Sequence, residues 1–463
     1  MTPTEVGAAR LDITPAAPVM LGGFGQRTEP ATEVHDPVEA VAVHVTDGSG
    51  RVLLVTADLI AVPAPVADAV TAEVGRRTGL TATQVCVAAS HTHSGPVPFD
   101  PSGSAPGVAA YTERLVAALV DVAMAAVTTT RPAVLRSGVG DAELGFNRWR
   151  PDDPDQVDRR VPVLVADDAG TGEPLVVLFG AGCHPTTMGW DNPAVSADYP
   201  GVAKRLVADR TGAIAAFVNT TEGDVVPFTS PRRDALDPRG YCGGSWLDAL
   251  SVGGRLADEV VRVVAAVRAT PTEPTPVGAA RIDLSLTPNH GGLDDAAAAV
   301  RLAESTAVLT EHLGEGFAER VAPGALWAAA SRVVVDRDLD EAEMRRLMVA
   351  CCYWLGLTAR LRRRAPAAPV TAPVQVLRLG GLDLLALPGE ALVAVGAEWR
   401  RRAGHDRAFV VGLANAHLRY LPRAEHFAEP GWDTRYETVT AGLAPDGVER
   451  ALDAGTELLV ALT

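Results

Sequence analysis

The amino-acid sequence predicts an α/β fold in which mixed β-sheets are layered with helices. Two observations support this fold class. Apolar runs typical of buried strands alternate with helix-like segments from residue 6 to about residue 268. Several of these runs end abruptly in polar residues, as parallel strands do where α/β sheets bind ligands. We expect one composite domain over residues 1–463.

Turn-forming and helix-breaking residues separate the predicted elements. Val38–Val45 and Arg51–Thr56 are expected to pair as strands, because the tetrad Asp-Gly-Ser-Gly at 47–50 is rich in turn formers. Residues 111–127 have helical periodicity. The proline-rich stretch at 269–276 is incompatible with a helix or a central strand, so an extended surface segment is expected there.

A helical insertion is expected over residues 277–370, covering one side of a cleft. Residues 294–314 and 338–364 have helical patterns. The second pattern begins with acidic residues and ends with arginines, as the helix dipole favours. A second segment rich in proline and alanine follows at 365–373. Val374–Leu379 and Leu382–Leu387 are then expected to form a strand pair that returns to the sheet.

Composition excludes several classes of function. The formal net charge of −16 argues against nucleic-acid binding, which requires a basic surface. The N-terminal residues lack the basic and apolar regions of a signal peptide, and no apolar run is long enough to span a membrane. Lys204 is the only lysine, so a phosphate-binding loop with its Gly-Lys pair is absent. We expect a cytoplasmic protein that does not insert into membranes.

The most informative motif is a pair of histidines after an apolar run. The run Val-Cys-Val-Ala-Ala at 85–89 resembles a buried strand, and His91 and His93 follow it closely. Residues i and i+2 of an extended chain point to the same side, so both imidazoles should project into one cleft. Imidazole is a common zinc ligand and the usual acid–base group near neutral pH.

Four further apolar runs also end in polar residues that can bind a metal. These residues are His184 after 175–180, Glu222 and Asp224 after 214–218, Glu390 after 382–387, and Asn415, His417 and Tyr420 after 409–414. Two histidines, a glutamate and a tyrosine on one rim would form a zinc site with an open position for water, which favours a hydrolase. His417 is an alternative ligand to Tyr420, and the same ligand types also suit iron or manganese.

Short motifs in a fixed order along the chain carry a resemblance to a known family. In order they are Gly7–Pro15, His35–Pro37, His91–Pro96, Asn147–Arg148, Cys183–Pro185, Gly223–Val225, Pro388–Ala391, and Ala414–Asn415 with Tyr420. Together they resemble the catalytic domain of the neutral/alkaline non-lysosomal ceramidases, zinc-dependent amidases that cleave the N-acyl bond of ceramide. The similarity extends from about residue 5 to about residue 445.

The resemblance implies roles for individual residues. The implied zinc ligands are His91, His184, Glu390 and Tyr420. His93 would lie beside the metal as an acid–base group, and Arg148 and Tyr436 would contact the amide carbonyl. In the family a serine follows the Gly-Asp-Val motif, whereas this chain has Val226. A mechanism here must therefore proceed without that hydroxyl.

The expected function is zinc-dependent hydrolysis of the amide (N-acyl) bond of a small molecule. We expect the protein to lack the C-terminal Ig-like domain and the signal peptide of the secreted ceramidases, and therefore expect a soluble amide in preference to ceramide. An ester or a lactone is an alternative substrate. A non-catalytic binding protein that retains the fold is an alternative of another class; Val226 favours it, whereas the retained polar ligands argue against it.

Several residues have two interpretations. Glu222 and Asp224 could replace His93 as the base, or Asp224 could bind nearby backbone amides in a turn. Trp149, together with Trp190 and Tyr199, could line an apolar substrate pocket, or all three could belong to the core.

Overall fold

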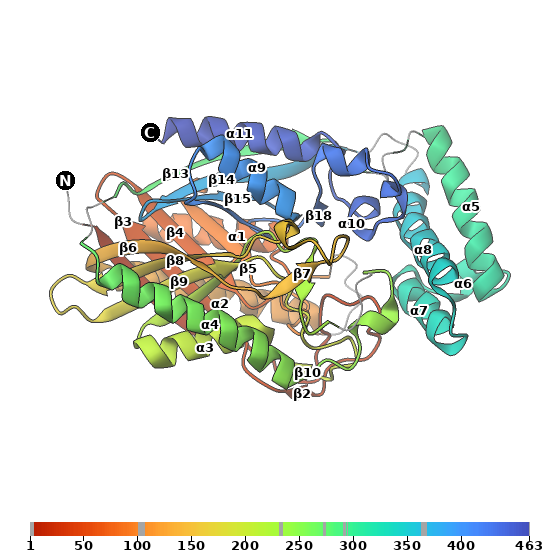
Figure 1. Ribbon diagram of the computed structural model, residues 1–463, viewed down its shortest axis with the longest axis horizontal. Coiled ribbons are helices and arrows are strands. Elements are labelled where there is room, and N and C mark those ends of the chain that lie inside the picture. Colours follow the sequence, from red (N-terminus) through yellow and green to blue (C-terminus); the bar gives the residue numbers. More distant parts are fainter. Residues whose placement is uncertain are drawn as a thin grey trace.

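Two β-sheets form the centre of the computed structural model, which describes residues 4–100, 107–230, 235–271, 275–289, 293, 295–362 and 368–462. The larger sheet has the strand order β11-β9-β8-β6-β1-β3-β4-β5, and the smaller has the order β13-β14-β15-β17 (Figure 1). The strands of the larger sheet are β1 (Glu5–Asp12), β3 (Glu39–Thr46), β4 (Arg51–Ala57), β5 (Val85–Ala89), β6 (Arg131–Asp141), β8 (Arg160–Asp168), β9 (Pro174–Ala181) and β11 (Ile214–Asn219). Those of the smaller sheet are β13 (Gly278–Leu286), β14 (Val370–Leu379), β15 (Leu382–Ala386) and β17 (Ala408–Val411).

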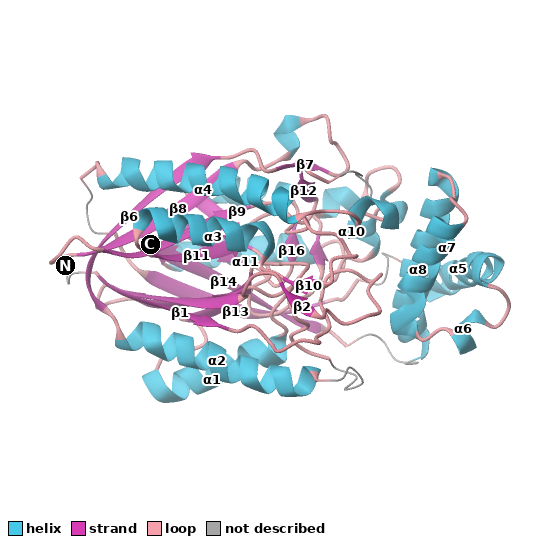
Figure 2. Ribbon diagram, turned by 90° about the horizontal axis from the view of Figure 1, so that it is seen from below, coloured by secondary structure: helices cyan, strands magenta, loops and turns pink. Residues whose placement is uncertain are grey.

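Helices cover the outer face of each sheet. The pairs α1 (Ala64–Thr78) with α2 (Val108–Thr128) and α3 (Asp198–Thr211) with α4 (Trp246–Arg268) pack on the larger sheet (Figure 2). The smaller sheet is covered by α9 (Val393–Ala403) and α11 (Gly447–Ala461). The predicted mixed α/β fold is confirmed.

The two sheets pack face to face, as the alternating directions of the side chains along a strand show. In β9, Val176 and Leu178 join the core between the sheets, whereas Val177 and Phe179 face α3 and α4. Successive side chains of a strand point to opposite faces, so a strand buried on both sides reads as a continuous apolar run. The molecule is therefore a four-layer sandwich of helices, sheet, sheet and helices.

The predicted strand pair around residues 47–50 is confirmed. β3 and β4 are antiparallel neighbours, and Ala40 lies opposite Ala57. The Asp47 carboxylate closes the turn by accepting hydrogen bonds from the backbone N–H groups of Ser49 and Gly50, at 2.9 and 2.7 Å. The helix expected over 111–127 is also present, as α2.

The helical segment of the chain lies between two strands of the smaller sheet. Its helices are α5 (Asp295–Leu313), α6 (Phe317–Arg320), α7 (Leu326–Asp336) and α8 (Glu341–Arg362). They share an apolar core of their own and lie at one end of the sandwich (Figure 1). The start of the expected insertion is β13, a strand that pairs with β14.

The expected linker at 365–373 is shorter than predicted, because β14 begins at Val370. Pro373 is opposite Asp283 of β13, whereas pairing between β14 and β15 begins only at Gln375. A proline that cannot donate a hydrogen bond is thus placed where β14 has one neighbouring strand. Residues 363–367, with the end of the predicted arginine run, lie outside the described residues.

Short strands complete the end of the sandwich where β5, β9, β11 and β17 terminate. They are β2 (Glu33–Val34), β7 (Gly145–Asn147), β10 (Ala194–Val195), β12 (Val225–Pro227), β16 (Glu390–Ala391) and β18 (Tyr420–Leu421), with the short helix α10 (Tyr436–Val439) beside them. In the described part of the chain, no helix combines the length and hydropathy needed to cross a bilayer.

Candidate functional site

Five buried side chains converge where the strands of the two sheets end. His184 Nε2 lies 3.3 Å from Glu390 Oε2 and 3.4 Å from the Tyr420 hydroxyl. His91 Nε2 lies 3.4 Å from the same Glu390 oxygen and 3.4 Å from His93 Nε2. The three histidines offer nitrogen atoms that all lie within 4.8 Å of one another. The structure therefore brings together all four residues expected as zinc ligands, with His93 beside them.

Backbone carbonyls fix the orientation of two of the imidazole rings. His91 Nδ1 lies 2.6 Å from the Ile60 carbonyl oxygen, and His184 Nδ1 lies 2.7 Å from that of Glu222. A carbonyl only accepts, so each Nδ1 carries a proton and each Nε2 presents a lone pair to the cluster. Burial lowers the pKa of His184 to about 4, which keeps this ring neutral.

The local backbone of His91 differs from the extended chain that the sequence predicts. β5 ends at Ala89, and His91 has a φ of 70°, in the left-handed region that a histidine adopts infrequently. Its N–H donates to the Leu59 carbonyl oxygen at 2.9 Å, which holds this conformation. The two imidazoles nevertheless meet, with 3.4 Å between their Nε2 atoms, although His93 alone of the two lines the cavity described below.

Parallel pairing of β16 with β18 places Glu390 opposite Tyr420. The second carboxylate oxygen, Oε1, lies 3.2 Å from Nε2 of His417, so His417 contacts the side of Glu390 away from the other histidines. Burial raises the pKa of Glu390, but contacts with His91, His184 and His417 lower it more, to well below its usual range. Glu390 is therefore an anion at neutral pH.

The donor set fits a divalent metal ion. Neutral imidazole nitrogens, one carboxylate oxygen and one phenol oxygen are suited to zinc, and also to iron or manganese. Burial and the charge of Glu390 raise the pKa of Tyr420 well above its usual value, so a phenolate would form there only beside a cation. Because Tyr420 lies in the cluster and His417 only touches its edge, the geometry favours Tyr420 as the ligand.

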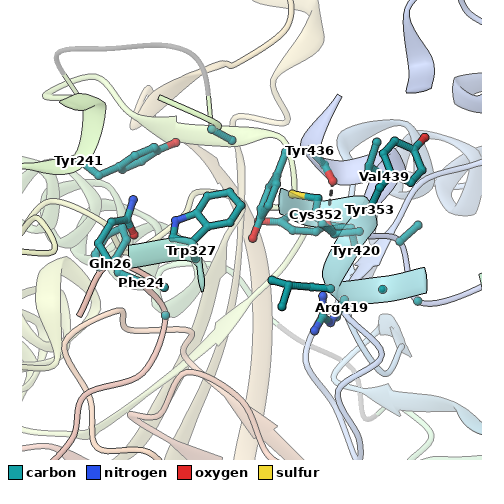
Figure 3. A pocket seen from close by; sticks show the side chains of 18 of the residues that line it. Phe24, Gln26, Tyr241, Trp327, Cys352, Tyr353, Arg419, Tyr420, Tyr436 and Val439 are labelled. Carbon is teal, nitrogen blue, oxygen red and sulfur yellow. Dashed lines mark hydrogen bonds between the residues drawn. The ribbon is translucent and has the colours of Figure 1, made fainter. Parts of the chain in front are cut away.

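A cavity of about 580 Å³ opens beside the cluster, between the end of the sandwich and the helical segment. His93 and His184 line it, together with Trp327 of α7 and Tyr353 of α8, whose side chains are labelled in Figure 3. The expected substrate-contacting residues Arg148 and Tyr436 also line it. A small molecule in this cavity would therefore reach the cluster directly.

His93 differs from the other two histidines in its surroundings. Its ring packs edge-on against Phe24, at 4.7 Å between ring centroids, and its Nδ1 has no hydrogen-bond partner among the described residues. Gly23, with a φ of 96°, lies so close that a Cβ there would be 2.5 Å from the ring. His93 is thus held by packing, and it lines the cavity next to the cluster.

Arg148 is buried and held by a carboxylate. Its Nη2 lies 2.5 Å from Glu437 Oε1 and 2.5 Å from the Gly223 carbonyl oxygen, and Nη1 lies 3.4 Å from the Tyr241 hydroxyl. Burial lowers the pKa of Arg148, but the charge of Glu437 raises it more, so the guanidinium stays charged. Arg148 therefore brings a fixed cation to the cavity wall.

The two alternative bases do not line the cavity. Asp224 Oδ1 accepts from the backbone N–H of Val393 at 2.9 Å, and Oδ2 accepts from Asn147 at 2.7 Å. Its role is to anchor the first residue of α9. Glu222 is fully buried, and neither of its carboxylate oxygens has a partner within the described residues. Burial raises the pKa of Glu222 well above its usual range.

Val226, at the position of the family serine, is fully buried in β12 opposite Phe146 and does not line the cavity. The three aromatic residues considered as pocket walls are also absent from the lining. Trp149 donates to Glu437 at 2.8 Å, Trp190 donates to the Pro238 carbonyl oxygen at 3.0 Å, and Tyr199 donates to that of Cys183 at 2.6 Å. They are structural.

Besides Tyr420 and Tyr436, the cavity is lined by four aromatic residues that the sequence analysis did not single out. They are Phe24, Tyr241, Trp327 and Tyr353. They come from a loop, from a 3-10 turn and from α7 and α8, far apart along the chain. None of them adjoins a motif, so only tertiary structure identifies them.

Comparisons with known proteins agree with this architecture, although no family model matches the chain. A neutral ceramidase from Mycobacterium tuberculosis is 27% identical over 496 residues, covering 94% of this chain and 73% of that protein. A neutral ceramidase from Pseudomonas aeruginosa is 25% identical and covers 74% of this chain, which spans 55% of that relative.

Solved structures extend the similarity to the fold. The crystal structure of neutral ceramidase from Pseudomonas aeruginosa has a TM-score of 0.74 at 22% identity, covering 100% of this chain and 75% of that chain. A ceramidase complexed with C2 has a TM-score of 0.72 at 20% identity, with the same coverage. The resemblance that the motifs predict is confirmed: this chain is similar to neutral ceramidases in sequence over 94% of its length and in fold over all of it.

Proposed function

We propose that the protein is a zinc-dependent hydrolase that cleaves an amide bond of a small molecule. The observation that carries this proposal is the convergence of His91, His184, Glu390 and Tyr420 beside the cavity, which His184 and Tyr420 line. The relatives named neutral ceramidase support an N-acyl bond as the target. A binding protein without activity would have no reason to keep these buried polar groups together.

Zinc held by these four residues would act as a Lewis acid that lowers the pKa of water to about 7 and polarises a carbonyl oxygen. His93 supplies the proton transfer in this proposal. Its Nε2 faces the cluster, at 3.4 Å from His91 Nε2, and would take a proton from the attacking water. The same atom would return the proton to the leaving amine nitrogen, since His93 also lines the cavity that holds the substrate.

Arg148 and Tyr436 would stabilise the negative charge that develops on the carbonyl oxygen. The ion pair with Glu437 fixes the Arg148 guanidinium before substrate arrives, so little reorganisation is needed during the reaction. Tyr436 lies against Tyr420, with 5.5 Å between the ring centroids, which places it next to a proposed ligand. Val226 has no part in this mechanism, because it does not reach the cavity.

The test is hydrolysis of a panel of N-acylated amines and matched esters by the protein as purified, after metal removal, and after addition of zinc. Cleavage of at least one amide, lost on metal removal and restored by zinc, is the expected result. Hydrolysis of esters alone would replace the amidase proposal by an esterase. Amide cleavage that persists without metal would refute the zinc dependence.

A further inference from the structure

The cavity has a charge character opposite to that of the whole protein. The chain has 57 acidic residues against 41 lysines and arginines. The described residues that line the cavity nevertheless include two arginines, Arg148 and Arg419, and neither aspartate nor glutamate. Among the described lining residues the charged side chains are all cationic, which in a strongly acidic protein indicates a ligand with negative charge.

The two arginines differ in whether they have a partner. Arg148 is paired with Glu437 at 2.5 Å. The exposed guanidinium of Arg419 has no hydrogen bond or ion pair with any part of the chain that the structure describes. Arg419 therefore offers a positive charge that no protein carboxylate neutralises.

The backbone holds Arg419 beside the proposed metal site. Its carbonyl oxygen accepts from the N–H of Glu390 at 2.9 Å, its φ is 59°, and the next residue is Tyr420. Figure 3 shows Arg419 close to Tyr420 and Cys352. Burial raises the pKa of Cys352 to about 12, and the charge of Arg419 opposes that rise, as expected for neighbours on the cavity wall.

We propose that the enzyme selects amides that carry a carboxylate, as N-acylated amino acids do, and that Arg419 binds this group. The proposal rests on the amidase function and names its substrate class. A guanidinium matches a carboxylate with two parallel hydrogen bonds, which a neutral hydroxyl cannot reproduce. The apolar surfaces of Trp327 and Leu357, on the helical side of the cavity, would contact the acyl chain.

The test compares three amides with the same dodecanoyl chain and the same two-carbon spacer between the amide nitrogen and the end group: N-dodecanoyl-β-alanine, N-dodecanoyltaurine and N-dodecanoylethanolamine. They end in a carboxylate, a sulfonate and a neutral hydroxyl. The kcat/KM for N-dodecanoyl-β-alanine is expected to be about 10- to 100-fold higher than that for N-dodecanoylethanolamine. This is the usual range for a hydrogen bond to a charged group. The kcat/KM for N-dodecanoyltaurine is expected to lie between these two values, because a tetrahedral sulfonate matches the planar guanidinium of Arg419 less well than a carboxylate does.

Arg419→Gln is expected to reduce this ratio to near one, and Arg419→Lys to restore part of it. A ratio is used so that a general loss of activity cancels. Arg262→Gln is the matched control, since it removes one positive charge from the exposed face of α4, where Arg262 pairs with Glu259. That variant should keep the full ratio.

Equilibrium binding of N-dodecanoyl-β-alanine, measured by calorimetry, provides a second readout that does not depend on turnover. Weaker binding to Arg419→Gln than to Arg262→Gln supports the proposal. Equal kcat/KM for charged and neutral amides, or equal binding by the two variants, would overturn it and leave the amidase function intact. Absence of any amide cleavage would instead count against the amidase function, and the binding comparison would still decide the role of Arg419.

Discussion

His184 Nε2 lies 3.3 Å from Glu390 Oε2, although 206 residues separate the two along the chain. His184 follows β9 of the larger sheet, and Glu390 begins β16, after β15 of the smaller sheet. The proposed metal site therefore forms only when the two sheets are packed against each other as in the native structure. A metal bound here would also tie the two sheets together, since binding to the native state alone stabilises it.

His93→Ala is predicted to keep the metal and to lose most activity. His93 lies at the edge of the cluster and lines the cavity, so it is proposed as the proton-transfer group. Loss of general acid–base catalysis typically lowers kcat by about 10²- to 10⁴-fold. Metal content and kcat are measured together, with His91→Ala as the comparison. If His91→Ala kept the metal and His93→Ala lost it, the roles of the two histidines would be exchanged.

Glu437→Gln is predicted to destabilise the protein strongly. The change leaves the buried Arg148 guanidinium without its counter-charge, which costs about 3 to 5 kcal/mol of unfolding free energy. Glu429→Gln is the control, because Glu429 pairs with Arg435 where both side chains are about one-quarter exposed. Such a pair contributes about 1 kcal/mol or less. Urea denaturation measures both, and equal losses would contradict the special role of the buried pair.

Asn415→Ala is predicted to lower the unfolding free energy by about 3 kcal/mol, because it removes two buried hydrogen bonds at a strained position. Asn415 Oδ1 accepts from the Val87 N–H at 3.0 Å, and Nδ2 donates to Gln375 at 2.9 Å. Its φ of 61° suits asparagine or glycine better than alanine. Asn415→Gly should therefore be more stable than Asn415→Ala by about 1 kcal/mol. If Asn415→Gly were instead less stable than Asn415→Ala, the positive φ at this position would contribute little to the unfolding free energy.

Stability is predicted to fall on acidification because of His44, a buried histidine of β3 that is not part of the proposed metal site. Burial, followed by the charge of Arg51, lowers its pKa to about 4. The unfolded chain, with a histidine pKa near 6.5, then binds the proton more tightly than the native state between these two values. Native stability is therefore lost as pH falls from about 6.5 to about 4. The loss between pH 7 and pH 5 should be about 1 to 2 kcal/mol.

His44→Gln removes this titration, so its unfolding free energy should fall less than that of the unmodified protein over the same interval. Denaturant unfolding at pH 7 and pH 5 gives the comparison. Other groups titrate equally in both proteins and cancel. Identical pH dependence in the two proteins would show that His44 is protonated as readily in the native state as in the unfolded chain.

Local patterns were sufficient for the elements that depend on neighbouring residues. The turn at Asp47 and the apolar run before His91 could be read directly, because strand alternation and turn chemistry are short-range effects. The polar residues after each run also indicated the site, since strand ends meet at one edge of a sheet. The expected set of His184, Glu390 and Tyr420 followed from these signals and from the resemblance.

Features that depend on long-range contacts were not predictable in this way. β13 pairs with a strand about 90 residues later, so its register needs β14. Nothing near Trp327 in the sequence marks it as a cavity wall, because α7 reaches the site only through the packing of the helical segment. The contact of Asp224 with Val393, 169 residues away, is likewise set by the fold.

Metal content tests the central claim most directly, measured by elemental analysis of the purified protein and of its His184→Ala and Glu390→Ala variants. His405→Ala is the control, because His405 pairs with Asp383 outside the cluster. The proposed site predicts about one zinc per chain in the unmodified protein and in the control, and loss of metal in both site variants. No bound metal after incubation with zinc, or full metal content in both site variants, would contradict the account.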